Sequence, residues 1–361
     1  MQRIIFHIDF DYFYAQVEET DNPKLKDRPI VVCMFSGRTE DSGAVATSNY
    51  VARGYGVKSG MPIAFAKKKL EDKNAIFIKA RHERYAEVSQ QLMMVIASYA
   101  DKFEQTSIDE AFIDVSKRIE NKYVKARQLA EELKKEIFEN YHFTCSIGIG
   151  PNKLIAKISS DIQKPNGLTI VRPPEVETFL GILDVDKIPG VGPKTKEALN
   201  MLGIKTVADL HKYNRTEIAE KFGKNTGAWL IKAANGEDDS EVAMVEEQKQ
   251  LSRIKTLKRN SREIGYIMTE IDELINDVAQ TLKDNNLVCT IVGINAIDSE
   301  LKNYTKSKTL VRATNDVSEI KNLIRELYRS LLETTFVEFR RTGVKVEKFE
   351  SKAGQKTLGE F

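Results

Sequence analysis

Short apolar runs that end beside acidic residues mark the N-terminal part of the chain. The run before Asp9 is mainly apolar and β-branched, which is the pattern of a buried central strand that delivers a carboxylate at its end. Two further strand-like runs, 103–107 and 111–115, lie on either side of Asp109 and Glu110. These two acids are therefore predicted to lie near a hairpin.

Helical periodicity follows further along the chain. Between 123 and 141 apolar residues recur every three or four positions, which predicts an amphipathic helix. A strand is predicted over 144–149, and a second helix then runs to the Pro-Asn-Gly break at 165–167. This alternation of strands and helices predicts an α+β sheet layer.

Glycines change the character of the chain between 184 and 213. Gly190 and Gly192 belong to a Pro-Gly-Val-Gly-Pro-Lys sequence that ends at Lys194 and precedes a helical pattern. This arrangement is typical of a helix-hairpin-helix. Because glycine lets backbone N–H groups approach a phosphate closely, such a turn binds the nucleic-acid backbone rather than the bases.

A separate small α/β domain is predicted from about 251 to 346. Two helical stretches, 267–282 and 317–332, lie there among strand-like runs. The segment 237–247 is strongly acidic, whereas 249–262 is basic and contains no acidic residue. The change of charge predicts a domain boundary between these segments.

Composition narrows the class of protein. A chain of 361 residues exceeds the usual size of one domain, and a hydrophobic content of 41% can fill more than one core. No apolar run is long enough to cross a bilayer, and no secretory signal is recognised, so we expect a soluble, cytoplasmic protein. The three cysteines show no CxxC pairing, which argues against a disulfide framework or a zinc site.

The acids are a weak signal when they are considered alone. Carboxylates at Asp9, Asp109 and Glu110 could converge on hard cations such as Mg²⁺. The alternative is that they are surface acids at strand ends or helix caps. The residues around them decide between these interpretations.

The motifs around these acids resemble, in order and spacing, those of Y-family DNA polymerases of the DinB type, most of all the archaeal branch. The resemblance spans nearly the whole chain, and several motifs in the right order are far more specific than any one of them. The segments that carry it are Asp9-Phe10-Asp11-Tyr12-Phe13-Tyr14, Ser42 to Arg53, Ser107-Ile108-Asp109-Glu110-Ala111, Lys164-Pro165-Asn166-Gly167 and Lys258-Arg259-Asn260-Ser261-Arg262.

The resemblance implies an α+β multidomain fold of the right-hand polymerase type. Its parts would be a ferredoxin-like palm, small fingers, a helical thumb with the helix-hairpin-helix, and an α/β little finger. The expected bounds are 1–10 and 78–167 for the palm, 11–77 for the fingers, 168–235 for the thumb, 236–248 for a linker, 249–346 for the little finger and 347–361 for a tail.

By resemblance, Asp9, Asp109 and Glu110 hold two Mg²⁺ ions, for which Mn²⁺ can substitute. The backbone carbonyl of Phe10 would be a further ligand. One ion would activate the primer 3′-hydroxyl, and the other would neutralise the triphosphate and its leaving group. Asp11 is expected to be a helix N-cap rather than a metal ligand.

The same resemblance assigns a site for deoxynucleoside triphosphates. Arg53 can bind phosphate with two parallel hydrogen bonds, whereas Lys164 supplies a compact charge. Tyr14 matches the steric gate that excludes a 2′-hydroxyl, and its alternative is a tyrosine of the core. The full set of matching positions is Phe13, Tyr14, Thr47, Tyr50, Arg53 and Lys164.

Small residues at Gly43, Ala44 and Ala46 match the family's cover over the nascent base pair. They would leave space for a damaged template base, so we expect translesion synthesis at low fidelity. No second acidic constellation of the exonuclease type is visible, and we expect no proofreading. Lys153 remains open between a solvated helix start and a phosphate contact, while Trp229 is expected in the thumb core.

A basic surface in the last domain matches the family's grip on primer-template DNA. Counterion release should make that binding salt-dependent. The alternative is a solvated charged face. The matching residues are Lys255, Lys258, Arg259, Arg262, Arg340 and Arg341.

The C-terminal tail has the spacing of a peptide that binds a sliding clamp, at Gln355, Leu358 and Phe361. Its alternative is a polar tail without function. We expect no membrane partner and a monomer. Two other functions compete: a nucleotide cyclase, which would need neither the hairpin nor the basic domain, and a DNA-binding scaffold with an inactive site.

Overall fold

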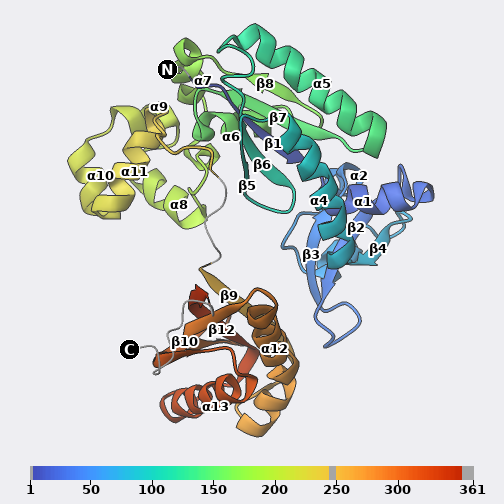
Figure 1. The fold of residues 1–361 in the computed structure, drawn as a ribbon, viewed down its shortest axis with the longest axis vertical. Coiled ribbons are helices and arrows are strands. Elements are labelled where there is room, and N and C mark those ends of the chain that lie inside the picture. The colour runs from blue at the N-terminus through green and yellow to red at the C-terminus, as the bar shows by residue number, and fades with distance from the viewer. Residues whose placement is uncertain (1–2, 244–248, 352–361) are drawn as a thin grey trace. The chain divides into compact units, whose positions relative to one another are not determined.

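The computed structural model describes residues 3–243 and 249–351, which fall into two compact units (Figure 1). No helix among these residues is long and apolar enough to cross a membrane. The first unit contains 3–33, 45–60 and 69–243, and the second contains 34–44, 61–68 and 249–351.

A five-stranded sheet with the order β5-β6-β1-β7-β8 forms the centre of the first unit. β1 lies in the middle and is antiparallel to both neighbours, whereas β8 is parallel to β7. The strands are β1 (Ile5–Phe10), β5 (Lys102–Gln105), β6 (Glu110–Asp114), β7 (Cys145–Gly150) and β8 (Leu168–Ile170). The predicted strands in this region are confirmed to within one or two residues at each end.

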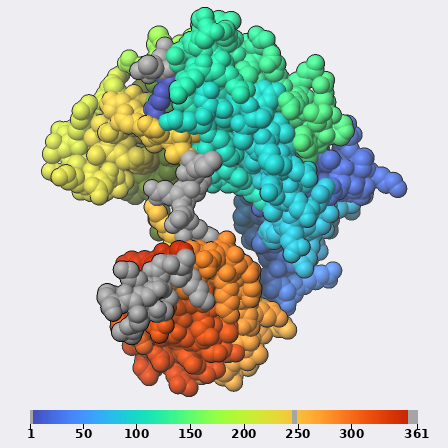
Figure 2. All heavy atoms as spheres, in the orientation of Figure 1, coloured from blue at the N-terminus to red at the C-terminus, as the bar shows by residue number. Residues whose placement is uncertain are grey.

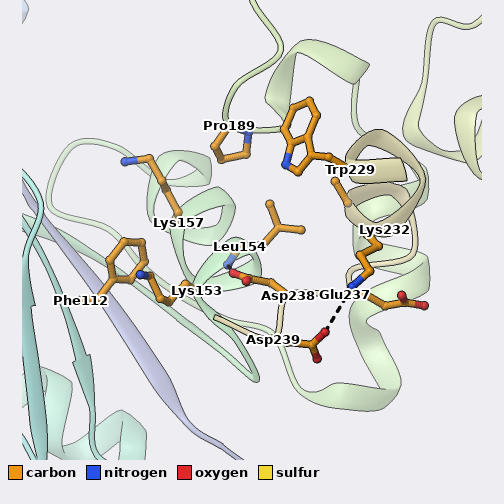
Figure 3. Close-up of a pocket in the computed structure, with 11 residues that line it drawn as sticks. Phe112, Lys153, Leu154, Lys157, Pro189, Trp229, Lys232, Glu237, Asp238 and Asp239 are labelled. Carbon is orange, nitrogen blue, oxygen red and sulfur yellow. Dashed lines mark hydrogen bonds and ion pairs between the residues drawn. The ribbon is translucent and has the colours of Figure 1, made fainter. Parts of the chain in front are cut away.

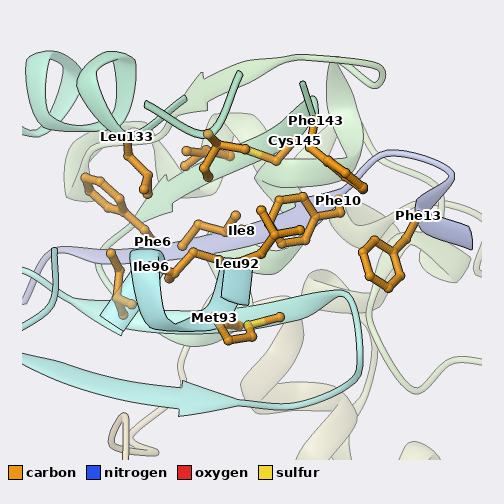
Figure 4. Close-up of a cluster of buried hydrophobic side chains, with 14 of the residues drawn as sticks. Phe6, Ile8, Phe10, Phe13, Leu92, Met93, Ile96, Leu133, Phe143 and Cys145 are labelled. Atoms are coloured by element: carbon orange, nitrogen blue, oxygen red, sulfur yellow. The ribbon is translucent and has the colours of Figure 1, made fainter. Parts of the chain in front are cut away.

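Alternate side chains of β1 point to opposite faces of this sheet. Phe6 and Phe10 are buried in the main hydrophobic core (Figure 4). Ile5, in contrast, belongs to a small cluster that includes Ala156. Because side chains alternate along a strand, Asp9 shares the face of Ile5 and points away from the main core.

Helices cover both faces of the sheet. Leu92 of α4 and Leu133 of α5 lie in the main core (Figure 4), and α6 packs against the opposite face. Gly148 of β7 lets α6 approach, because a Cβ there would lie 2.0 Å from the carbonyl oxygen of Ala156. The helices are α1 (Phe13–Asp21), α4 (His82–Ser98), α5 (Tyr123–Tyr141) and α6 (Lys153–Ile162).

A three-stranded sheet with the order β3-β2-β4 follows α1. β2 and β4 are parallel. Gly43, at the start of β3, has φ +140°, and a Cβ there would lie 2.2 Å from the carbonyl oxygen of Met34, so only glycine fits. The elements are η1 (Pro23–Leu25), β2 (Ile30–Phe35), β3 (Gly43–Ser48), α2 (Tyr50–Gly54), α3 (Ile63–Lys69) and β4 (Ile76–Lys79).

Short helices follow β8 and surround a core of their own. The predicted turn at Gly190 and Gly192 precedes α8, as expected for a helix-hairpin-helix. The ring of Trp229 lies against Gly190 and is 37% exposed, so it is at the edge of this core rather than inside it. The elements are η2 (Pro173–Glu175), α7 (Val176–Gly181), η3 (Val185–Lys187), α8 (Pro193–Met201), α9 (Val207–Lys212), α10 (Arg215–Phe222) and α11 (Lys224–Ala234).

The second unit contains an antiparallel sheet with the order β11-β10-β12-β9. Its two helices share one hydrophobic core with one face of the sheet, and they reach the surface of this unit in Figure 2, where they are orange and red. The elements are β9 (Gln250–Ser261), α12 (Ile264–Asp284), β10 (Leu287–Asp298), β11 (Asn303–Thr314), α13 (Val317–Thr334) and β12 (Phe339–Ser351). The predicted α/β domain is confirmed, although β12 runs past the expected end at 346.

Candidate active site

The register of the first sheet brings the predicted acids together. Asp9 of β1 pairs with Glu110 of β6, so their Cα atoms are direct neighbours across the two strands. Asp109 comes immediately before β6, and its carbonyl oxygen accepts a 3.0 Å hydrogen bond from the N–H of Phe10. The hydroxyl of Ser107 donates to the Asp109 carboxylate at 2.7 Å. Three carboxylates thus gather at one end of the sheet.

Two lysines neutralise two of these acids. Lys164 Nζ lies 2.7 Å from Asp9 Oδ2, and Lys157 Nζ lies 2.6 Å from Glu110 Oε2. Burial raises the pKa of Asp9 to about 7, against the opposing charge of Lys164. Each ammonium group contacts one oxygen of a carboxylate that is predicted to bind a metal ion.

The buried side chain of His7 also contacts Glu110. His7 Nε2 lies 3.5 Å from Glu110 Oε2, and this contact, together with Lys157, lowers the pKa of Glu110. His7 Nδ1 is 2.7 Å from the hydroxyl of Ser160 in α6. Burial in turn lowers the pKa of His7. Glu110 is consequently held as an ionised group with a fixed orientation.

The three acids supply hard oxygen donors, which suit Mg²⁺. In the described part of the chain, however, no three acidic, histidine or cysteine side chains are arranged as a ready metal cage. Asp9 and Glu110 each direct one carboxylate oxygen toward a lysine ammonium group.

A cavity of about 350 Å³ lies beside the acids. It brings together residues of β1, α1, β3, α2 and the loop after α6, which are distant in sequence. Most of the residues predicted for metal and nucleotide binding line it. The lining residues are Asp9, Phe10, Asp11, Tyr12, Phe13, Tyr14, Ala46, Thr47, Tyr50, Arg53, Ser59, Ile108, Asp109 and Lys164.

Aromatic contacts fix the wall of this cavity. The ring of Tyr14 stacks on Tyr85, with centroids 4.3 Å apart, and remains partly exposed, so it is not a residue of the interior core. Phe13 also borders the cavity, but its side chain is 2% exposed and belongs to the main core. The guanidinium of Arg53 lies 4.8 Å from the ring centroid of Tyr50, and its Nε donates to the carbonyl of Ser48.

Asp11 is not the expected N-cap. The N-cap position of α1 is Tyr12, whose side chain makes no capping bond. The carboxylate of Asp11 is buried and instead accepts hydrogen bonds from Thr144, Ser146 and Asn166. The short side chain of Asp11 thus serves β7 and the loop after α6 rather than the helix that it precedes.

A second pocket, shown in Figure 3, lies between α6, the hairpin and α11. Lys157 lines it, but its ammonium points away toward Glu110, and Pro189 and Trp229 line the opposite side. Lys153 also lines it but contacts Glu104 at 2.7 Å and is 17% exposed. Of the two alternatives left open for Lys153, the ion pair with Glu104 disfavours a solvated helix start, and a phosphate contact stays a prediction.

The hairpin places Gly192 at the N-cap of α8, directly before Pro193 and Lys194. Gly190 has φ +100°, a backbone conformation that favours glycine. Free N–H groups at a helix N-terminus and a nearby lysine are suited to bind a phosphate.

The predicted basic residues of the second unit do not all share one face. Arg341 pairs with Thr256, whereas Lys255 pairs with the buried Thr342, so Arg341 and Lys255 point to opposite sides of the sheet. Lys255 contacts Glu270 of α12 at 3.3 Å. Lys255 therefore lies on the face covered by the helices.

The remaining predicted cations lie near the end of β9, just after it, or near the start of β12. Lys258 and Arg259 are exposed. Arg262 lies over the ring of Phe336 and donates to the carbonyl of Leu332. The tail residues Gln355, Leu358 and Phe361 lie outside the described residues.

Sequence reasoning missed the groups that hold the acids in place, namely His7, Lys157 and Ser160. No spacing signal points to His7, because its partner Glu110 is on another strand. Lys157 follows Lys153 by one helical turn, so the sequence alone did show that both lysines share one face of α6.

Family models match three parts of the chain. Residues 8–161 match the impB/mucB/samB family, and residues 248–358 match the C-terminal domain of that family. Residues 186–238 match a model described as the thumb domain of DNA polymerase-iota. Together these matches cover most of the sequence.

Relatives and solved structures match over nearly the full length. DNA polymerase IV of Nitrosopumilus maritimus is 42% identical over 99% of both chains, and DNA polymerase IV 1 of Methanosarcina mazei is 42% identical over the whole of both. A Y-family DNA polymerase chimera of Dbh and Dpo4 matches with a TM-score of 0.90 at 37% identity, covering 96% of this chain and 98% of that one. An insertion ternary complex of Dbh DNA polymerase matches with a TM-score of 0.68, at the same identity and coverage.

Proposed function

The chain belongs to the impB/mucB/samB family of Y-family DNA polymerases, and we propose that it extends a primer on a DNA template, past damaged bases, at low fidelity and without proofreading. The observation that carries this proposal is the pairing of Asp9 with Glu110, with Asp109 beside them, at the edge of a cavity lined by cations and aromatic rings. Each part of the reaction can be attributed to residues of this site.

Asp9, Asp109 and Glu110, with the carbonyl of Phe10, would hold two Mg²⁺ ions, or Mn²⁺ in their place. When bound, such ions activate the primer hydroxyl and neutralise the triphosphate. His7 and Ser107 orient the carboxylates through the contacts described above. Burial raises the pKa of Asp9 to about 7 although Lys164 lies beside it, and a bound divalent cation would lower that pKa further.

Arg53, Lys164, Tyr50 and Thr47 would bind the triphosphate of the incoming deoxynucleotide. They line the cavity from two separate elements and the loop after α6, so their groups can reach one ligand. Tyr14 would contact the sugar and exclude ribonucleotides, because its ring is fixed by stacking on Tyr85. Gly43, Ala44 and Ala46 would cover the base pair and leave room for a lesion.

Primer-template DNA would be held by the hairpin and the basic sheet. The N–H groups around Gly190 and Gly192, with Lys194, fit phosphates of one strand. On the sheet, Lys258, Arg259, Arg262, Arg340 and Arg341 would contact the duplex backbone. We assign the palm, fingers, thumb and little finger to the residue ranges expected from the family.

The tail would bind a sliding clamp through Gln355, Leu358 and Phe361. Deletion of 355–361 should abolish stimulation of synthesis by the clamp and spare basal synthesis. Equal stimulation of the shortened and full-length chains would remove this part of the proposal. We further propose that the protein acts as a cytoplasmic monomer.

Primer extension tests the central proposal. With Mg²⁺, all four deoxynucleotides and either an intact or an abasic template, the parent should extend the primer and Asp109→Ala should not. Failure of both proteins to extend, with DNA binding intact, would favour an inactive DNA-binding scaffold. Extension of the intact template alone would retain the polymerase and reject lesion bypass. A nucleotide cyclase would consume triphosphate without any primer.

A further inference from the structure

Asp11 is a buried carboxylate whose oxygens are both engaged. Oδ1 accepts a 2.8 Å hydrogen bond from the hydroxyl of Ser146. Oδ2 accepts one from the hydroxyl of Thr144 at 2.9 Å and one from the N–H of Asn166 at 2.8 Å. The residue is 1% exposed. Three donors converge on a buried anion, which fixes its position and theirs.

The N–H bond matters most, because Asn166 belongs to the loop that carries Lys164. The next residue, Gly167, donates its N–H to the hydroxyl of Ser146 at 3.2 Å. On the other side, Lys134 Nζ donates to the carbonyls of Asn166 at 2.7 Å and Gly167 at 2.9 Å. The loop is thus held between one buried anion and one partly buried cation.

The backbone so held determines where the Lys164 ammonium can reach. Lysine has a long flexible stem, so its charge is placed only as well as its backbone is anchored. Lys164 Nζ reaches Asp9 and Asp161 at 2.7 and 2.8 Å from this loop. A shift of the loop would move the ammonium relative to both the acids and the cavity.

We propose that Asp11 is a positioning residue for Lys164, which it places through the N–H of Asn166 so that the ammonium meets the triphosphate of the incoming nucleotide. This inference rests on the proposed function, in which Lys164 binds that triphosphate. Asp11 has the sequence position of a second metal acid, only two residues after Asp9. Its oxygens, however, are both bound to donors from β7 and the loop.

The test is a double-mutant cycle on nucleotide affinity. The parent, Asp11→Asn, Lys164→Ala and the double variant are each bound to a primer-template that ends in a dideoxynucleotide. The matching deoxynucleoside triphosphate is then titrated in Mg²⁺ to obtain its Kd. Asp11→Asn replaces one carboxylate oxygen with an N–H donor and removes the negative charge, so it cannot accept all three hydrogen bonds and weakens those that it keeps.

Asp298 provides a matched control. It is 4% exposed and accepts hydrogen bonds from the N–H groups of Glu300 and Lys302 and from the hydroxyl of Tyr304. Asp298→Asn therefore disturbs an equally buried and equally bonded carboxylate in the other unit, and should leave the nucleotide Kd unchanged.

Asp11→Asn should raise the Kd about tenfold, the size of effect expected for loss of a charge-assisted hydrogen bond. In the Lys164→Ala background the same change should raise it less than about twofold, since the two residues act as one unit. The Mg²⁺ concentration that gives half-maximal extension should stay unchanged. If Asp11→Asn is unstable, Thr144→Val removes one donor alone and should raise the Kd about threefold.

Four results would overturn the inference, the last of them together with the proposed function. An equal rise in both backgrounds would mean that Asp11 does not act through Lys164. A shift in the Mg²⁺ requirement without a change in Kd would make Asp11 a metal ligand. No rise for Asp11→Asn, when Lys164→Ala does raise the Kd, would leave only the proposed function standing. If Lys164→Ala has no effect, the proposed triphosphate role fails, and this inference fails with it.

Discussion

The acid cluster at β1 and the basic face of the second sheet are both charged, yet they are built in opposite ways. In the cluster, Asp9 and Glu110 each contact a lysine ammonium, at 2.7 and 2.6 Å. On the sheet, Arg340 and Arg341 make no ion pair with the residues that the structure describes, although the neighbouring Lys345 contacts Glu347 at 2.6 Å. Two acids of the cluster are thus paired within the protein, whereas Arg340 and Arg341 keep their charge for a partner.

On the helix-covered face of the second sheet, in contrast to Arg340 and Arg341, the cations are paired with acids. There Arg253, Lys255 and Lys308 contact acids of the helices at 3.3 Å or less. A charged side chain in an ion pair has a fixed position but attracts a charged ligand less. A charged side chain without an ion pair attracts a polyanion such as DNA but does not fix its position. A substitution in the acid cluster should therefore reduce the reaction rate by a large factor. A substitution at Arg340 or Arg341 should reduce the affinity for DNA by a smaller factor.

The largest effect is expected from Glu110→Gln. This change removes a metal acid and leaves Lys157 without its counterion, so primer extension should slow by about 10³-fold or more. The chain offers a matched control, because Glu104 and Lys153 form a second ion pair between the sheet and α6. Glu104→Gln should leave single-nucleotide turnover within about twofold.

Equal losses for the two variants would break the comparison. They would mean that any ion pair between the sheet and α6 maintains the activity, and that the acid cluster has no special role. Circular dichroism and a DNA-binding titration on each variant separate this outcome from simple unfolding.

A smaller effect is expected at Tyr14, the uncharged wall beside the cluster. Tyr14→Ala removes the ring that stacks on Tyr85 and opens space next to the nucleotide. Discrimination against ribonucleotides, measured as a ratio of kcat/KM values, should fall by roughly 10²-fold. Tyr14→Phe keeps the ring and should keep the discrimination. Identical ratios for the parent and Tyr14→Ala would refute the steric gate.

The acid site could be predicted from sequence because its members lie at strand ends. Asp9 follows an apolar run and Asp109 precedes another, and the strand register then brings them together. His7 and Lys157 could not be predicted, since their contacts with Glu110 depend on that register and on the packing of α6. Sequence periodicity predicts which face of a helix or strand a side chain occupies. It does not predict which residue of another element that side chain contacts.

Asp11 and Lys255 show where local patterns misled. An aspartate before a helix favours an N-cap, but the hydroxyl of Ser146 and the N–H of Asn166 compete for the same carboxylate and bind it. Lys255 alternates with the buried Leu251 and Leu257 along β9, so strand alternation did point it toward the helices. The resemblance to a basic DNA surface obscured that signal.

The smallest effect is expected at Arg340 and Arg341, near the start of β12. Neutralising Arg340 and Arg341 with alanine should weaken primer-template binding roughly tenfold near physiological salt. It should also reduce the slope of log Kd against log salt by roughly 2, because each phosphate contact releases about one counterion. Fluorescence anisotropy over a range of salt concentrations measures both quantities.

Lys255 sharpens this last test, because it belongs to the same predicted set but faces α12. Its charge is already paired with Glu270, so Lys255→Ala should leave the salt slope unchanged. It should lower the free energy of unfolding by about 1–3 kcal/mol, because the largely buried Glu270 carboxylate loses its cation. A slope reduced by about 1 would mean that Lys255 leaves Glu270 to bind a phosphate. In that case a cation that is paired in the free protein would bind DNA as an unpaired one does. The proposed difference between paired and unpaired cations would then be contradicted.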